Sequence, residues 1–150
     1  MRLEQFQLID RVERFEREQK RIVCRCEVPR VSSIFDGHFP GHPLLPGTMM
    51  IEAIAQAAGA LVLVLHEFRR MPVLIGVEKA RMRGMVKPGA VLAAEGQLVQ
   101  EGAGYVAAVG HLSQAGKKVA EAEVRLGTLP FPSEPLRNEA RKFARELGLI

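Results

Sequence analysis

The segment from Thr48 to Leu65 contains no proline, and Glu52 carries its only ionisable side chain. Apolar residues occupy every side of the helix that this segment predicts, and a helix of this kind is buried. The residues before it have the opposite character, because glycine and proline recur between residues 37 and 47. They predict a rigid, compact loop that is poor in regular structure. The rest of the chain must therefore fold around one buried helix that such a loop enters.

Glu52 is the residue that stands out in this buried helix, and Gln56 follows it one turn later on the same face. A lone buried carboxylate is costly to ionise and tends to hold its proton. A protonated carboxyl in a dry cleft can act as a general acid. The simpler alternative is a surface glutamate on the exposed edge of a core helix.

His38 in the preceding loop favours the catalytic interpretation. The loop doubles back to the helix start, so His38 can lie close to the first helical turn. A histidine and a carboxylic acid that face one cleft form a base and acid pair for removing water from a β-hydroxy carbonyl compound. The backbone N–H groups of Gly47 and Thr48 at the helix start would be free to polarise a carbonyl oxygen.

These residues also carry a family resemblance. The sequence GHFPGHPLLPGTMMIEAIAQAAG, residues 37–59, resembles the signature of the FabZ-type (3R)-hydroxyacyl-[acyl-carrier-protein] dehydratases of the hotdog-fold superfamily. The match includes HFPG, the following P-x-x-PG and the E-A-x-A-Q helix, and the related FabA enzymes carry aspartate where this chain has Glu52. LIGVEKARMR at 74–83 and VKPG at 86–89 resemble the family's next strand and turn. At the N-terminus only FQLIDRV, Phe6–Val12, matches the longer opening segment of the family, which helps to cover the substrate region.

The resemblance implies an α+β hotdog fold, in which an antiparallel sheet wraps around one long buried central helix. The strand pattern agrees, because turn sequences separate alternating or apolar runs. The expected strands are Arg21–Val28, Val73–Met82, Val91–Gln100, Tyr105–Leu112 and Val119–Leu126. We expect Leu3 to Phe15 to begin as a short helix or turn and to lead into the first strand.

The C-terminal residues predict an additional amphipathic helix. Ser133 is a suitable N-cap and Pro135 a suitable early residue, and the helix extends to Gly148. Its expected apolar face consists of Leu136, Ala140, Phe143, Ala144 and Leu147. We therefore divide the chain into a hotdog dehydratase domain, residues 1–132, and a helical tail, residues 133–150. We expect the tail to pack on its own chain, and the alternatives are a neighbouring subunit or the tunnel mouth.

By resemblance, His38 matches the catalytic histidine of the family and Glu52 its catalytic acid. His38 would take a proton from C2 of the thioester, and Glu52 would protonate the departing C3 hydroxyl. The thioester carbonyl would lie against the N–H of Gly47, while Gln56 would position Glu52 or water. The Leu44 carbonyl would bind the other ring nitrogen of His38. This reaction needs no metal and no organic cofactor.

The expected partner is acyl carrier protein, which is acidic. Lys79, Arg81, Arg83 and Lys87 form a basic stretch, next to the expected cleft, that would receive it, although a solvated strand face is an equal alternative. Members of the family are homodimers whose active sites combine histidine from one subunit with glutamate from the other, and they often assemble as trimers of dimers.

Several other classes of protein are disfavoured. The net charge of +4 and the isoelectric point of about 9.4 raise nucleic acid as a partner, but no basic run is interleaved with aromatic residues. Cys24 and Cys26 share one face of a strand, so we expect unpaired buried thiols. The N-terminus lacks the apolar core of a signal peptide, and the apolar run Ala53–Leu65 is too short for a bilayer span. These features predict a cytoplasmic protein.

Two other functions compete with dehydration. One is a hotdog thioesterase or a hydratase that acts on coenzyme A esters, although those families usually place the acid or base differently and lack this combined motif. The other is a non-catalytic acyl-binding subunit, which is disfavoured because both reactive side chains are present.

Overall fold

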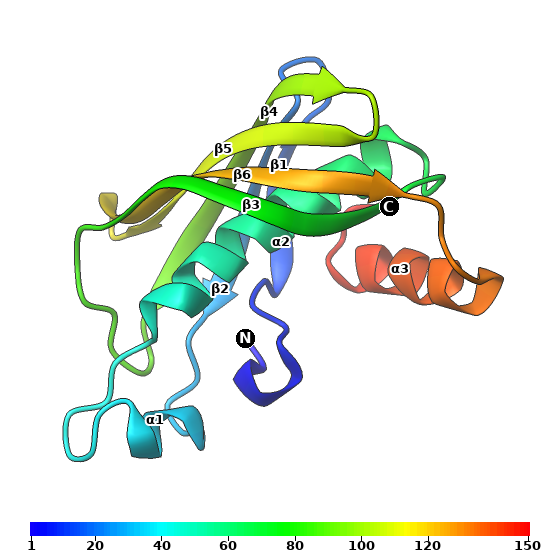
Figure 1. Cartoon of the computed structure of the whole chain (residues 1–150). Coiled ribbons are helices and arrows are strands. Elements are labelled where there is room, and N and C mark those ends of the chain that lie inside the picture. The colour runs from blue at the N-terminus through cyan, green and yellow to red at the C-terminus, as the bar shows by residue number, and fades with distance from the viewer.

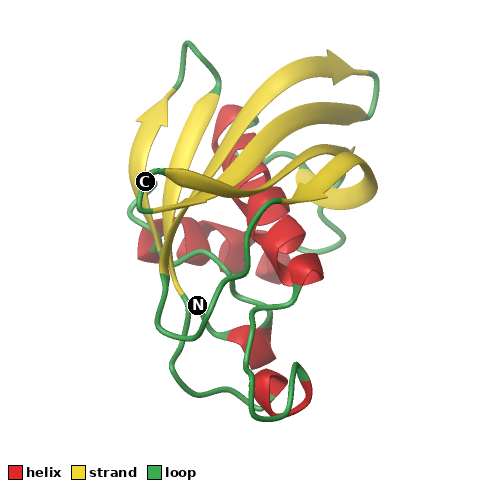
Figure 2. Ribbon diagram, turned by 90° about the vertical axis from the view of Figure 1, so that its left-hand side faces the viewer, coloured by secondary structure: helices red, strands yellow, loops and turns green.

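The computed structural model describes the whole chain, residues 1–150, as one antiparallel sheet that curves around a long helix (Figure 1). The sheet has six strands in the order β1-β2-β4-β5-β6-β3. The strands form one curved layer, and the helices lie on its concave side (Figure 2). The strands are β1 (Arg11–Glu16), β2 (Arg21–Glu27), β3 (Met71–Met82), β4 (Val91–Gly102), β5 (Tyr105–Gln114) and β6 (Lys117–Leu129). The helices are η1 (Leu3–Gln5, a 3-10 turn), α1 (Ile34–Gly37), α2 (Gly47–Leu65) and α3 (Glu134–Glu146).

The predicted buried helix is α2, and small residues let it approach the sheet closely. Gly96 of β4 and Gly110 of β5 are paired in register directly beneath it. A Cβ atom at Gly110 would lie 2.4 Å from Cγ2 of Ile54, and one at Gly96 would lie 3.1 Å from the backbone nitrogen of Ala58. The two glycines therefore bring the helix into contact with the sheet backbone, which fixes the position of every residue along α2.

The helix is longer than the apolar run Ala53–Leu65 suggested. It spans 19 residues and is long and apolar enough to cross a bilayer, so run length was the wrong argument against a membrane span. However, 72% of its apolar window is buried within the protein. Burial against the sheet makes it a core helix.

All five strands expected from alternation are present, in most cases a few residues longer than expected. Two elements were not predicted. The first is β1, an edge strand that pairs only with β2 and exposes most of its charged side chains, so it has little hydrophobic alternation. The second is α1, a single helical turn at the start of the glycine- and proline-rich loop, where no regular structure was expected.

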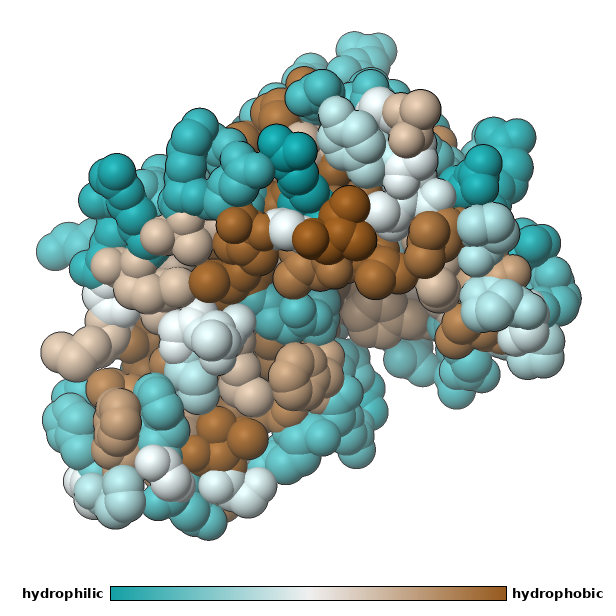
Figure 3. Space-filling view, viewed as in Figure 1, coloured by the Kyte–Doolittle hydropathy of each residue, from teal (hydrophilic) through white to brown (hydrophobic).

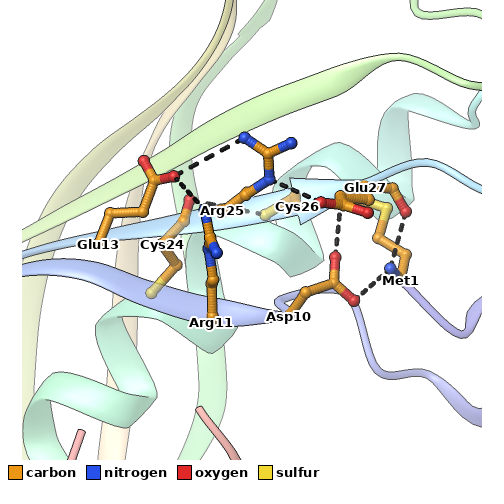
Figure 4. Close-up of polar contacts among 8 residues, drawn as sticks. All are labelled: Met1, Asp10, Arg11, Glu13, Cys24, Arg25, Cys26 and Glu27. Atoms are coloured by element: carbon orange, nitrogen blue, oxygen red, sulfur yellow. Dashed lines mark hydrogen bonds and ion pairs between the residues drawn. The ribbon is translucent and has the colours of Figure 1, made fainter. Parts of the chain in front are cut away.

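Polar contacts hold the N-terminal segment against β2 (Figure 4). The Asp10 carboxylate accepts from the Met1 amino group and from the backbone N–H of Glu27, the latter at 2.6 Å. Cys24 and Cys26 are unpaired and buried on the inner face of the same strand, as predicted. Burial raises the pKa of the Cys24 thiol to about 12, so this residue is an unreactive part of the core.

The predicted C-terminal helix is α3, and it packs on its own chain. Ser133 caps it by accepting a hydrogen bond from the Leu136 backbone nitrogen at 3.4 Å, and Gly148 beyond its end has a positive φ of +70°. On its apolar face, Ala144 and Leu147 are buried, whereas Leu136 is 41% exposed and does not join the core. The helix therefore docks through its C-terminal half.

Candidate active site

A cavity of about 440 Å³ lies along one face of α2. The helix contributes residues that recur every three or four positions, so they form one continuous stripe. They are Glu52, Ala55, Gln56, Gly59, Ala60 and Leu63. The cavity is polar at the Glu52 end and apolar towards Leu63. Its remaining walls come from four parts of the chain: residues 5–7, strand β3, Leu126 of β6 and Phe143 of α3.

Gln56 fixes the carboxyl group of Glu52. Its amide nitrogen donates to Oε1 of Glu52 at 3.0 Å and to the Phe6 carbonyl at 2.7 Å. Its amide oxygen accepts from the Leu8 backbone nitrogen at 2.9 Å. Both Glu52 and Gln56 are half-buried, so neither is the freely solvated surface residue of the simpler alternative. The N-terminal segment and the carboxyl group are thus joined through one amide.

His38 lies at the end of α1, and its ring is oriented by the loop that follows. Its Nδ1 is 3.0 Å from the Leu44 carbonyl oxygen, which can only accept, so Nδ1 carries the hydrogen and Nε2 has a free lone pair. The Leu44 backbone nitrogen donates to the His38 carbonyl at 2.8 Å, and the ring stacks on Phe39 with centroids 4.2 Å apart. The loop therefore fixes the orientation of the imidazole ring and leaves Nε2 without a hydrogen-bond partner in the chain.

The start of α2 presents unused backbone donors. The N–H groups of Met49 and Met50 both bind the Pro46 carbonyl, whereas those of Gly47 and Thr48 have no acceptor in the chain. Free N–H groups at a helix start carry partial positive charge. A thioester oxygen placed here would find two donors.

His38 and Glu52 do not share one cavity within a single chain. Glu52 lines the cavity along α2, and His38 is absent from its walls. The segment that bears His38, α1 with the following loop, extends away from the sheet beyond the first turn of α2 (Figure 1). Within one chain, His38 and Glu52 therefore lie at two separate places.

The basic stretch in β3 and the following turn lies apart from this cavity. Lys79 and Arg81 line a second groove of about 330 Å³, whose charged walls come from strand positions that alternate with the buried ones. This groove is therefore on the outer face of the sheet. Lys79 pairs with Glu123 at 2.7 Å and Arg83 pairs with Glu121, while Lys87 is exposed in the turn before β4. No group of three histidine, cysteine or acidic side chains is gathered as a metal site.

The curved antiparallel sheet around α2 defines a hotdog-fold protein, and solved structures agree. The dehydratase heterocomplex ApeI:P from Xenorhabdus doucetiae superposes with a TM-score of 0.68 at 20% identity, covering 89% of this chain and 90% of that chain. A putative thioesterase from Ralstonia eutropha JMP134 superposes with a TM-score of 0.63 at 17% identity, covering 77% of this chain and 82% of that chain. At these identities the likeness shows a common fold and not a common reaction.

Sequence comparison is more specific. The model of the FabA-like domain matches residues 2–123. The FabZ 3-hydroxyacyl-[acyl-carrier-protein] dehydratase of Clostridium acetobutylicum is 40% identical over 118 residues, which cover 78% of this chain and 83% of that protein. The FabZ protein of Koribacter versatilis is 35% identical over 130 residues, which cover 85% and 83%. The chain belongs to the FabZ family of FabA-like dehydratases, which confirms the resemblance seen in the sequence.

Three features of the site were not foreseen. Gln56 binds the N-terminal segment as well as Glu52, residues 5–7 form a wall of the cavity, and Phe143 reaches the cavity from α3. Helical periodicity placed Phe143 on the apolar face of the tail, for which the tunnel mouth was one alternative, but it did not distinguish a core residue from a cavity residue. The contacts of Gln56 join residues about fifty positions apart, so no local pattern contains them.

Proposed function

We propose that this protein dehydrates (3R)-hydroxyacyl-[acyl-carrier-protein] to trans-2-enoyl-[acyl-carrier-protein] in fatty-acid or lipid A acyl-chain biosynthesis. The observation that carries the proposal is the position of Glu52. This carboxyl group lies in the wall of a cavity whose other lining residues are mostly apolar and is held there by Gln56, in a chain of the FabZ family. An acyl chain fits the apolar part, and its β-hydroxyl group would meet the carboxyl group.

The reaction follows from the groups described. Nε2 of His38 takes a proton from C2 while the N–H groups of Gly47 and Thr48 bind the thioester oxygen, on which negative charge develops. The electron pair of the broken C2–H bond then forms the C2–C3 double bond. Glu52, in its protonated form, donates to the C3 hydroxyl, which leaves as water. The hydrogen bond from Nδ1 to Leu44 keeps the tautomer that this step needs.

The complete site would need two chains, and the surface of β3 supports a homodimer. This strand is a free edge of the sheet, since its only partner is β6. Its exposed side chains are largely apolar, and Figure 3 shows a band of hydrophobic residues running along it. The exposed apolar residues of β3 are Val73, Leu74, Ile75, Val77 and Met82. An apolar, unpaired edge of this kind is a template for pairing with a second chain.

In the proposed dimer, His38 of one subunit completes the site that contains Glu52 of the partner subunit. The separation of these residues within one chain is the reason for this arrangement. The family resemblance further suggests that dimers assemble as trimers of dimers. We also propose that residues 1–132 form the catalytic domain and residues 133–150 a tail, and that the enzyme acts in the cytoplasm without a metal or other cofactor.

Acyl carrier protein is the proposed carrier of the substrate. Within the basic stretch, Arg81 and Lys87 make no ion pair in the chain, whereas Lys79 and Arg83 are paired with carboxylates. We therefore assign docking chiefly to Arg81 and Lys87, where a new acidic partner need not displace an existing one.

Mass spectrometry of a carrier-bound (3R)-hydroxybutyryl thioester tests the reaction, with wild type beside Glu52→Gln. We expect the wild type to remove water and the variant to leave the substrate unchanged. The reverse reaction from the enoyl thioester is run in parallel, so that the test does not depend on the position of the equilibrium. Release of free carrier would identify a thioesterase, and an unchanged mass with every chain length would identify an acyl-binding subunit.

A further inference from the structure

The cavity extends along α2 towards α3, which contributes to its wall. The lining of α2 begins at Glu52 and ends at Leu63, a distance of about 16 Å at a rise of 1.5 Å per residue. Phe143 is the one residue of α3 that lines the cavity. An acyl chain that starts at Glu52 and follows α2 would therefore approach the phenyl ring with its terminal methyl group.

The passage towards Phe143 is narrow and apolar. Ala55, Gly59 and Ala60 give it a floor of small residues. Pro72 of β3 lies opposite, and a Cβ atom at Gly59 would be 3.5 Å from Cγ of that proline. The missing side chain at Gly59 thus leaves room for one methyl group between the helix and the strand at this point of the cavity wall.

The phenyl ring is held in place because the surrounding part of α3 is fixed. Ala144, next to Phe143, packs with Leu63, Val64 and Phe68 in a small apolar cluster. At the end of the helix, the Val12 backbone nitrogen of β1 donates to the Leu147 carbonyl at 2.7 Å. The part of α3 that carries Phe143 is therefore anchored at two points to the rest of the chain.

We propose that Phe143 sets the longest acyl chain that this enzyme accepts, with a limit near the length of a hexadecanoyl chain. The inference rests on the proposed dehydration. An extended chain advances about 1.2 Å per bond, as in a polypeptide, where three bonds span at most about 3.6 Å. About a dozen bonds therefore fit between C3 at Glu52 and the end of the cavity. Octanoyl and dodecanoyl chains fit, and chains longer than hexadecanoyl meet the ring.

Chain-length preference tests this directly. We expect Phe143→Ala to raise kcat/KM for a hydroxyoctadecanoyl substrate relative to the hydroxyoctanoyl one by about tenfold or more, the usual effect of methylene-sized changes in an apolar pocket. Phe143→Leu serves if the alanine variant does not fold. Phe131→Ala is the matched control, since Phe131 packs beside the same cluster but does not line the cavity. An unchanged ratio in both Phe143 variants would overturn the proposal.

Gly59→Ala makes the cavity smaller, whereas Phe143→Ala makes it larger. The risk to the fold is low, because alanine favours a helix more than glycine does. The added methyl group would contact Pro72 and narrow the passage. We expect dodecanoyl substrates to lose activity while butanoyl substrates keep theirs. Equal loss for both chain lengths would contradict an acyl path along α2.

A binding measurement separates this inference from the proposed reaction. The chain contains no tryptophan, so Phe143→Trp and the control Phe131→Trp each introduce a single fluorescent reporter. The probes are saturated acyl-pantetheine thioesters from butanoyl to hexadecanoyl. We expect the emission of the Phe143→Trp protein to change only from a threshold length onwards and that of the control to stay constant.

The two experiments fail independently. A length threshold in a protein without dehydratase activity would refute the proposed reaction and support the role of Phe143. Dehydratase activity with no fluorescence response at any chain length would refute the role of Phe143 and support the proposed reaction.

Discussion

The amide nitrogen of Gln56 donates to Oε1 of Glu52 at 3.0 Å, and the same amide binds the backbone of Phe6 and Leu8. Gln56 therefore both holds the Glu52 carboxyl group and attaches the N-terminal segment to α2. Any displacement of that segment would change the direction of the Glu52 carboxyl group.

Gln56→Ala should reduce both stability and turnover. It leaves the partly buried N–H of Leu8 without an acceptor, which costs about 1–3 kcal/mol. It also frees the carboxyl group, and a misplacement of about 1 Å costs up to about a hundredfold in rate. Thermal unfolding and steady-state kinetics measure the two effects.

Gln56→Glu separates the two roles. Its carboxylate can still accept from Leu8 but cannot donate to Glu52. We expect kcat to fall with little change in KM, while stability recovers in part. If Gln56→Ala is as active as the wild type, Gln56 has no positioning role.

The sequence contained enough information to predict the central helix, five of the six strands and α3. Each of these elements has a strong local pattern: all-round apolarity in α2, alternating or apolar runs in the five strands, and a cap with an apolar face in α3. Strand β1 lacked such a pattern because an edge strand of charged residues buries little surface. The prediction that Leu136 belongs to the packed face of α3 was wrong for a related reason. Helical periodicity does not indicate how much of a helix packs against the rest of the chain.

The candidate site was predictable to a different extent. The motif identified His38 and Glu52, and the His38–Leu44 contact expected from it exists in the structure. The residues that close the cavity come from the two ends of the chain, and only the fold brings them together at α2. Tertiary contacts of this kind have no local sequence signal.

Glu52→Gln should abolish most turnover without unfolding the protein. The amide has the shape of the carboxyl group but cannot supply the proton, and loss of a general acid costs about 10²–10⁴-fold. Glu67→Gln, at an exposed position beyond the end of α2, is the matched control. Full activity in Glu52→Gln would exclude Glu52 as the acid.

A mixture of His38→Ala and Glu52→Gln proteins should recover activity that neither has alone. In a two-fold dimer with shared sites, each mixed dimer has one intact site out of two. Random exchange makes half of the dimers mixed, so we expect about a quarter of the wild-type rate. Exchange is verified by native mass spectrometry, and no recovery after complete exchange would refute a shared site.

Ile75→Lys should disrupt the dimer. Ile75 is 62% exposed on the free edge strand β3, where a buried charge would face the second chain. Val99→Lys is the control, since Val99 is 57% exposed on β4, which is an inner strand of the sheet. We expect sedimentation to show a monomer, and activity to be lost, only for Ile75→Lys. Equal sedimentation of the two variants would remove β3 from the interface.

Glu4 should make the stability of the N-terminal segment depend on acid pH. Its carboxylate accepts from the Ser32 hydroxyl at 2.6 Å and from the Ser33 backbone nitrogen at 2.9 Å, which ties η1 to the residues just before α1. The hydrogen bond from Ser32 is the largest cause that lowers the pKa of Glu4 from 4.5 to about 2. The unfolded chain therefore binds this proton first as the pH falls.

The stabilisation by Glu4 is fully present above pH 4.5 and is lost as the pH falls towards about 2. Glu4→Gln cannot titrate, so its melting temperature should decline less than that of the wild type across this window. Glu18→Gln is the control, because Glu18 makes no hydrogen bond or ion pair in the chain and should behave as the wild type does. Parallel acid profiles for Glu4→Gln and the wild type would show that the link between η1 and the residues just before α1 does not contribute to stability.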